Sequence, residues 1–79
     1  SQEANKVVYG ETEVDKALEM GAVDKLLLSE ALDDDMVERY EDKAEETGAE
    51  VILISTETSE GAQLKDIGRI AAILRFALN

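Results

Sequence analysis

The sequence contains no cysteine and no histidine. Without cysteine, the chain can form no disulfide, no thiolate nucleophile and no cysteine-ligated zinc site. Without histidine, it lacks the usual acid/base group for neutral pH and the commonest ligand for transition metals. These two absences exclude most catalytic templates, and we predict that the chain is not an enzyme and has no catalytic residue, no metal site and no cofactor.

Positive charge is scarce as well, because 8 Lys and Arg stand against 19 Asp and Glu and the formal net charge is −11. Nucleic-acid backbones and anionic lipid headgroups bind to clustered Lys and Arg, so we predict no direct nucleic-acid partner and no membrane partner. No apolar run approaches the roughly 20 residues of a membrane span, and residues 1–6 do not resemble a signal peptide. We therefore expect a cytoplasmic protein.

Phosphate-binding and calcium-binding patterns are also missing. The five glycines match neither the G-x-G-x-x-G spacing nor the P-loop spacing of phosphate-binding loops. Asp33, Asp34 and Asp35 are adjacent, whereas calcium loops place their ligands at alternate positions around a glycine, so these residues are interpreted as the start of a helix. A small carboxylate-based hydrolase has nothing in its favour except the abundance of Asp and Glu.

The hydrophobic residues make up 44% of the 79-residue chain and recur in separate blocks, which indicates one small folded domain. Short apolar runs alternate with amphipathic segments in the order β-α-β-α-β-α-β. This pattern predicts an α/β fold with a mixed four-stranded sheet and helices on both faces. The strands are expected at 6–9, 23–28, 51–54 and 70–76, with the uninterrupted apolar runs 26–28 and 51–54 at the centre of the sheet.

The expected helix ends are marked by capping residues. Thr12, with Asp15 three residues later, is predicted to cap a helix over residues 11–20. Gly21 and Gly48 are placed for the left-handed conformation that ends a helix, and Gly68 ends a third, short helix that includes Ala62, Leu64 and Ile67. The first helix should bury Val14, Ala17 and Leu18.

Most of the negative charge lies between Ser29 and Glu50, where ten acidic residues face only Arg39 and Lys43 and leave a local net charge of −8. We interpret these carboxylates as the solvated face of a helix whose inner face carries Val37, Tyr40 and Ala44. A docking face for a basic partner and adaptation to a high-salt cytoplasm remain alternatives.

The last strand has an arginine near its end. Strand alternation places Ile70, Ala72, Leu74 and Phe76 on one face and Ala71, Ile73 and Arg75 on the other. An arginine is not buried without partners, so the Ile73/Arg75 face is expected to open to solvent or to a partner, while Leu74 and Phe76 belong to the core. Replacing Arg75 with Glu should then weaken docking and leave the fold intact. An ordinary surface arginine among many carboxylates is the alternative.

Several segments together resemble one known family, the third, C-terminal domain of the archaeal and eukaryotic class-1 translation release factor and of its paralogue Pelota. The matching segments, in chain order, are VYG at 8–10, ALEMGAVD at 17–24, LLLSE at 26–30, GAEV at 48–51, STETSEGAQL at 55–64 and the strand at 70–76. The resemblance implies the fold of the kink-turn-binding ribosomal proteins and a single domain, residues 1–79, at the C-terminus of a longer release factor.

What the resemblance implies about function is a docking module. In the family this domain recruits a translational GTPase of the elongation-factor type and then an ABC-type recycling ATPase, and reaches the ribosome through the full-length factor. A Gly-Ile-Leu-Arg-Tyr segment tied to GTPase docking in the eukaryotic relatives maps onto residues 72–76 with Ala and Phe at its two ends. The residues thereby expected to bind a partner are Ile73, Leu74, Arg75 and Phe76. The family's Asn-Ile-Lys-Ser and Gly-Gly-Gln loops are absent, so this chain should neither read codons nor release peptide.

Some residues depart from the family or divide its members. The loop 55–61 looks like the release factor, because Pelota usually has a histidine near Thr58, and Pelota is the alternative. A ribosomal-type RNA-binding module is the alternative from another class, against which the charge of −11 argues. Before the last strand, this chain has Gly68-Arg69 where the family commonly has Gly-Gly. Because a positive φ favours glycine, the arginine argues against a positive φ at the second of these two positions. The zinc ribbon of many archaeal release factors is missing near residues 31–33, either from the gene or from the chain as it stands here.

Overall fold

A computed structural model describes residues 6–77 of the chain. Its elements follow the predicted order of four strands and three helices, which confirms the α/β class. The elements are β1 (Val7–Tyr9), α1 (Glu11–Glu19), β2 (Val23–Ser29), α2 (Asp34–Thr47), β3 (Glu50–Ile54), α3 (Ser59–Asp66) and β4 (Ile70–Leu74).

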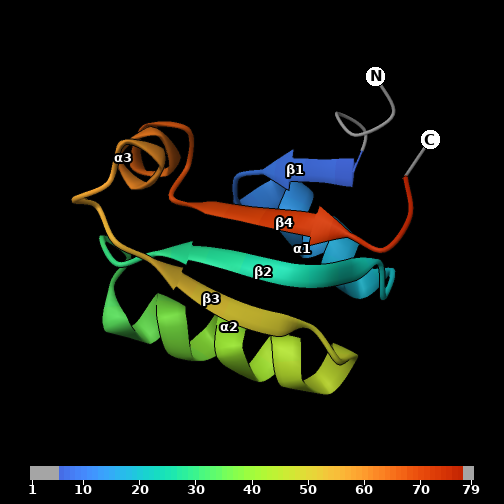
Figure 1. Cartoon of the computed structure of the whole chain (residues 1–79). Helices are drawn as coiled ribbons and strands as arrows, with labels where there is room; N and C mark the ends of the chain where they lie inside the picture. The colour runs from blue at the N-terminus through green and yellow to red at the C-terminus, as the bar shows by residue number, and fades with distance from the viewer. Residues whose placement is uncertain (1–5, 78–79) are drawn as a thin grey trace.

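The sheet has the strand order β1-β4-β2-β3 (Figure 1). The last strand, β4, lies between β1 and β2 and is antiparallel to both, whereas β3 is parallel to β2 and lies at the edge. The prediction that 51–54 is a central strand is therefore wrong, while β2 is central as expected. The apolar run of β3 is only partly covered, since Leu53 is 56% exposed, and such a run does not report whether both edges of a strand are paired.

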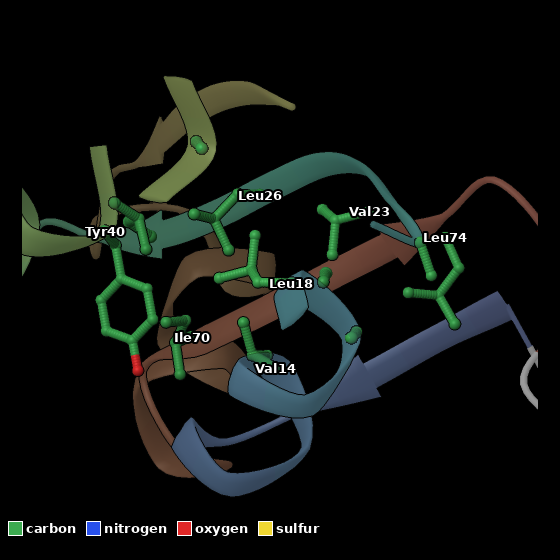
Figure 2. Close-up of a cluster of buried hydrophobic side chains, with 12 residues drawn as sticks. Val14, Leu18, Val23, Leu26, Tyr40, Ile70 and Leu74 are labelled. Carbon is green, nitrogen blue, oxygen red and sulfur yellow. The ribbon is translucent and has the colours of Figure 1, made fainter. Parts of the chain in front are cut away.

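Helices cover both faces of the sheet, as predicted. On one face, α1 packs on β1 and β4 and α2 packs on β2 and β3, while α3 packs on the other face near one end (Figure 1). Figure 2 shows Val14 and Leu18 of α1 facing Leu26 of β2 and Ile70 of β4, with Tyr40 of α2 at one end of this cluster. The inner faces predicted for both helices are buried, apart from Val37, which is partly buried.

The start of α1 differs from the prediction. The helix begins at Glu11, directly after Gly10 with φ 85°, and no side chain caps it, so Thr12 is not the cap. Gly21 and Gly48 do adopt the left-handed conformation expected of them, with φ 66° and 78°. Glycine tolerates this region because it has no Cβ, which is why these two residues end their helices reliably.

The link between β2 and α2 is short and closed by its own hydrogen bonds. The Ala31 amide donates to the Ser29 hydroxyl at 3.0 Å, and the Leu32 amide donates to the Ser29 carbonyl at 3.1 Å. As predicted, α2 begins after Asp33, with Asp34 and Asp35 in its first turn, although the Asp33 side chain makes no capping hydrogen bond. The negative side chains still favour the positive end of the helix dipole.

The turn from α3 into β4 explains the Gly68-Arg69 departure. Arg69 has φ 67°, so the left-handed conformation at the second position is required here although the residue is not glycine. Its amide donates to the Leu64 carbonyl at 2.7 Å, and its carbonyl accepts from the Ser29 amide at 2.9 Å. Both bonds hold the backbone in a conformation that costs an L-residue about 1–2 kcal/mol.

Candidate partner-binding surface

The four residues predicted to bind a partner lie at the end of β4, but they do not share one surface. Ile73 is half-buried on the sheet face that α3 partly covers, whereas Leu74 points into the core and is 4% exposed. Phe76 is 51% exposed, so the prediction that it belongs to the core is wrong. The strand ends at Leu74, and strand alternation no longer governs the residues beyond it.

Ile73 lines an apolar groove of about 300 Å³ between the sheet and α3. The groove walls include Val7 and Tyr9 of β1, Leu27 of β2, Ala71 of β4 and Ile67, the residue that follows the C-terminal end of α3. Tyr9 and Ile67 are about half exposed, and the carboxylate-bearing Glu60 and the amide-bearing Gln63 are the polar lining residues. Such a groove can accept an apolar side chain of a partner, but it brings no nucleophile or acid/base pair together.

Arg75 forms a bridge within the fold. Its Nε donates to the Val23 carbonyl at 2.9 Å, and its Nη2 donates to the carbonyls of Thr47 at 3.2 Å and Gly48 at 2.9 Å. Thr47 and Gly48 end α2, so the cation satisfies carbonyls at the negative end of the helix dipole. The side chain is exposed, as predicted, and these contacts predict that its replacement would weaken the fold as well as any docking.

A polar seam joins α1 to α2. The buried Tyr40 hydroxyl donates to Asp15 Oδ1 at 2.7 Å, and burial, followed by the contact with Asp15, raises the pKa of Tyr40. Lys43 and Arg39 lie 3.6 and 3.8 Å from the Asp15 carboxylate, and Arg39 is also 3.8 Å from Glu11. The two cations of α2 therefore face α1.

Sequence reasoning missed a role for Glu30. Its Oε1 accepts from the Thr56 amide and hydroxyl, both at 2.9 Å, and from the Ser55 hydroxyl at 3.4 Å. The hydrogen bonds from Thr56, first that of its amide, lower the pKa of the Glu30 carboxyl. The positions of Glu30 and Ser55 in the sequence could have indicated this contact. Each follows one strand of the parallel pair β2 and β3, and the carboxyl ends of neighbouring parallel strands lie at the same edge of a sheet.

The loop that Glu30 holds is also packed against the start of α3. Thr58 caps the helix, since its Oγ1 accepts from the Gly61 amide at 2.9 Å and donates to the Ser55 carbonyl at 3.2 Å. A Cβ added to Gly61 would lie 1.7 Å from the Ser55 carbonyl oxygen. Gly61 is therefore needed for close approach, while Gly10, Gly21, Gly48 and Gly68 have positive φ.

Within residues 6–77, no three side chains of His, Cys, Asp or Glu come together in a way that could hold a metal ion. Over the same residues, every helix is too short or too polar to cross a membrane.

Comparison with known proteins identifies the fold. The family model of eRF1 domain 3 matches residues 1–78. A Pelota homologue from Methanothermobacter thermautotrophicus is 43% identical over 79 residues, which are 99% of this chain and 22% of that protein. Peptide chain release factor subunit 1 from Aeropyrum pernix is 43% identical over 74 residues, 92% of this chain and 19% of that protein. The chain thus spans about a fifth of these curated relatives.

Solved structures agree with these matches. The archaeal translation termination factor aRF1 superposes with a TM-score of 0.81 at 43% identity, over 92% of this chain and 21% of that one. Dom34 of S. cerevisiae, described as a translation termination-like factor that interacts with Hbs1, gives 0.78 at 37% identity, over 94% and 22%. A model of ribosome-bound archaeal Pelota and ABCE1 gives a TM-score of 0.79 at 35% identity, over 95% of this chain and 22% of that one. With the family match along almost the whole sequence, these likenesses show that the chain belongs to the eRF1 domain 3 family, which archaeal release factors and Pelota proteins share.

Proposed function

We propose that this domain is a non-enzymatic recruitment module of a factor that acts on ribosomes in translation termination or ribosome rescue. Its partners are a translational GTPase of the elongation-factor type and an ABC-type recycling ATPase, and its location is the cytoplasm. The observation that carries the proposal is the match of residues 1–78 to eRF1 domain 3. The interaction of Dom34 with Hbs1, and the ribosome complex of Pelota with ABCE1, support partners of these kinds.

Ribosome rescue is at least as well supported as termination. Most of the similar curated relatives are Pelota homologues, at 43% to 47% identity for the Methanothermobacter, Methanopyrus and Methanocaldococcus proteins. The release-factor interpretation of the loop 55–61 depended on Thr58. Because Thr58 caps α3 through its hydroxyl, its identity reflects the start of this helix as well as the choice between paralogues.

The residues proposed to contact the GTPase are Ile73 and Phe76, with Leu74 and Arg75 holding the end of β4 in place. Ile73 opens onto the apolar groove, and Phe76 presents an aromatic side chain that is half exposed. Aromatic and aliphatic side chains of this kind often dominate binding energy at interfaces. Arg75 already donates three hydrogen bonds within the fold, so it acts mainly through the position of its neighbours.

Chimeric factors test the function directly. The third domain of the Aeropyrum release factor and that of the Methanothermobacter Pelota homologue would each be replaced by this 79-residue chain. Peptide release at stop codons and dissociation of stalled ribosomes would then be measured with the matching GTPase and ATPase. Activity in at least one background supports recruitment, and the background that is restored identifies the pathway. Two well-folded chimeras that are both inactive and bind neither partner would contradict the proposal.

Matched substitutions test the surface. Phe76→Ser should weaken GTPase binding about tenfold or more, because a buried aromatic anchor is worth more than 1 kcal/mol at an interface. The control is Met20→Ser, which removes another large apolar side chain, 62% exposed, at the end of α1. Calorimetry measures binding, and thermal melts show whether both variants remain folded. Equal affinities for the two variants would remove Phe76 from the interface.

A further inference from the structure

Beyond the charged Glu50 at its start, the outer edge of β3 lacks the protections that natural sheets usually carry. Within residues 6–77, β3 pairs with β2 alone, and no strand lies on its other side (Figure 1). Exposed edges are commonly blocked by a lysine, a proline, a bulge or a very short strand. The other edge strand, β1, has three residues and follows Lys6, whereas β3 reads Glu-Val-Ile-Leu-Ile over five residues.

The backbone of β3 offers hydrogen-bonding groups at alternate residues. The Ile54 carbonyl accepts from the Glu30 amide at 3.0 Å, so the polar groups of Ile54 point toward β2. Because the direction alternates along a strand, those of Ile52 also point toward β2, and those of Val51 and Leu53 point outward. Leu53 is moreover 56% exposed. The edge therefore presents two residues in the spacing with which an added strand pairs.

The flank of α2 above this edge is acidic. Arg39 and Lys43 face α1, where they contact Glu11 and Asp15. Helical geometry places four other side chains together on the flank of α2 that is opposite α1. This flank lies toward the outer edge of β3, because α1 packs on β1 and β4 and α2 packs on β2 and β3. These residues are Asp34, Glu38, Glu41 and Glu45, and all four are exposed.

From these observations, we propose that the outer edge of β3 binds an extended segment of a partner protein, a strand in which cationic and apolar residues alternate. Side chains on one face of the added strand lie beside the acidic flank of α2, where lysines can reach carboxylates. Those on its other face lie beside Ile52 and Ile54, where apolar residues fit. A second copy of this chain does not fit, because its own β3 edge would bring like charges together. This surface is separate from Phe76, so it does not depend on the recruitment surface proposed above.

Capped peptides provide the probe for this edge. The test peptide alternates lysine and valine, the first control alternates glutamate and valine, and the second keeps the lysines but is interrupted by prolines, which cannot donate to a ladder. Fluorescence anisotropy with the 79-residue chain should show binding of the lysine–valine peptide at least about tenfold tighter than of either control. Amide NMR shifts should centre on Val51 and Leu53. No binding of the test peptide, or equal binding of the proline peptide, would overturn the proposal.

Variants of the chain locate the contact. Leu53→Pro removes one outward amide without removing a bond to β2, and it should weaken peptide binding about tenfold, whereas Leu53→Thr, which keeps the amide, should weaken it less. Glu45→Lys should weaken binding severalfold, while Glu46→Lys, the same change on the flank toward α1, should not. If Leu53→Pro does not fold, the proline peptide still decides. Self-association of the chain through β3, seen by sedimentation, would identify a second copy as the occupant and overturn the proposal.

Discussion

The two ends of the sheet are held by opposite charges that do similar work. At one end, the Arg75 guanidinium donates to the carbonyls of Val23, Thr47 and Gly48. At the other end, the Glu30 carboxylate accepts from Ser55 and Thr56. Arginine remains charged at every accessible pH, whereas a carboxylate does not. The fold is therefore secured in a pH-independent way at the Arg75 end and in a pH-dependent way at the Glu30 end.

The largest effect is expected from Gly61→Ala at the Glu30 end. The new methyl group would meet the Ser55 carbonyl oxygen at 1.7 Å, so the loop would have to move away from α3 and lose its cap. We expect a loss of about 3 kcal/mol or more, since overpacking against the backbone is combined with loss of a capping bond. Urea denaturation measures the loss, and Gly21→Ala is the comparison, because its new methyl group meets nothing within 4 Å and its cost comes from the positive φ of Gly21 instead of a clash. A smaller loss for Gly61→Ala than for Gly21→Ala would show that the loop yields easily.

Leu74→Ala tests the packing of the core beside Arg75. Leu74 is 4% exposed, and its truncation should cost about 2–5 kcal/mol through lost burial and the cavity left behind. Phe76→Ala, two residues later and half exposed, should cost less than about 1 kcal/mol. Thermal unfolding of both variants makes the comparison. Similar losses for the two would mean that Phe76 contributes to the core after all.

Arg75→Met separates the charge of Arg75 from its apolar stem. The substitution removes three hydrogen bonds to carbonyls and a cation at the end of α2. Because the side chain is exposed, we expect a modest loss of about 1–2 kcal/mol, with a drop in melting temperature that is the same at pH 5 and pH 8. The control is Arg69→Met, the same substitution at another exposed arginine. An unchanged melting temperature for Arg75→Met would show that the three hydrogen bonds do not stabilise the fold, and Arg75 would again be a candidate for direct contact with a partner.

Glu30→Gln should reveal the titration at the other end. The folded-state pKa of Glu30 lies below its ordinary value of 4.5, so its charge stabilises the fold above about that pH, and this stabilisation disappears as the pH falls through the lowered pKa. The melting temperature of the wild type should exceed that of the variant at pH 7, and the difference should vanish at strongly acidic pH. Glu57→Gln, in the same loop, is the control, and a pH-independent difference for Glu30→Gln would rule out a role for the charge.

The smallest effect is expected from Arg69→Gly, which removes the side chain from the left-handed position. Relief of the local conformational cost of about 1–2 kcal/mol is largely offset by the greater freedom of glycine in the unfolded chain. The net stabilisation should therefore be no more than about 1 kcal/mol. Chemical denaturation of wild type and variant in parallel measures it, and a clear destabilisation would show that the Arg69 side chain makes contacts of its own.

The sequence predicted the individual helices and strands better than it predicted which strands lie next to one another in the sheet. Periodicity identifies Val14, Leu18 and Tyr40 as buried because the period of a helix repeats within a few residues. Strand order is decided by contacts between distant segments, so the apolar runs of β3 and β2 looked alike although one lies at an edge. Arg75 illustrates the same limit for the candidate site. Its exposure followed from its charge, but its partners Thr47 and Gly48 lie at the end of α2, 28 and 27 residues earlier in the chain.

The position of β4 has a consequence for synthesis of the chain. The first strand, β1, pairs with β4 and with no other strand among the described residues, so β1 has no partner strand until residues 70–74 have been made. The unit β2-α2-β3, by contrast, is complete once Ile54 has emerged. Assembly of this domain on the ribosome should thus proceed in two stages, because residues 10–69 are made between the end of β1 at Tyr9 and the start of its partner strand at Ile70. Closure of such a large loop is slow compared with local pairing, and the insertion of β4 is the step that completes the sheet.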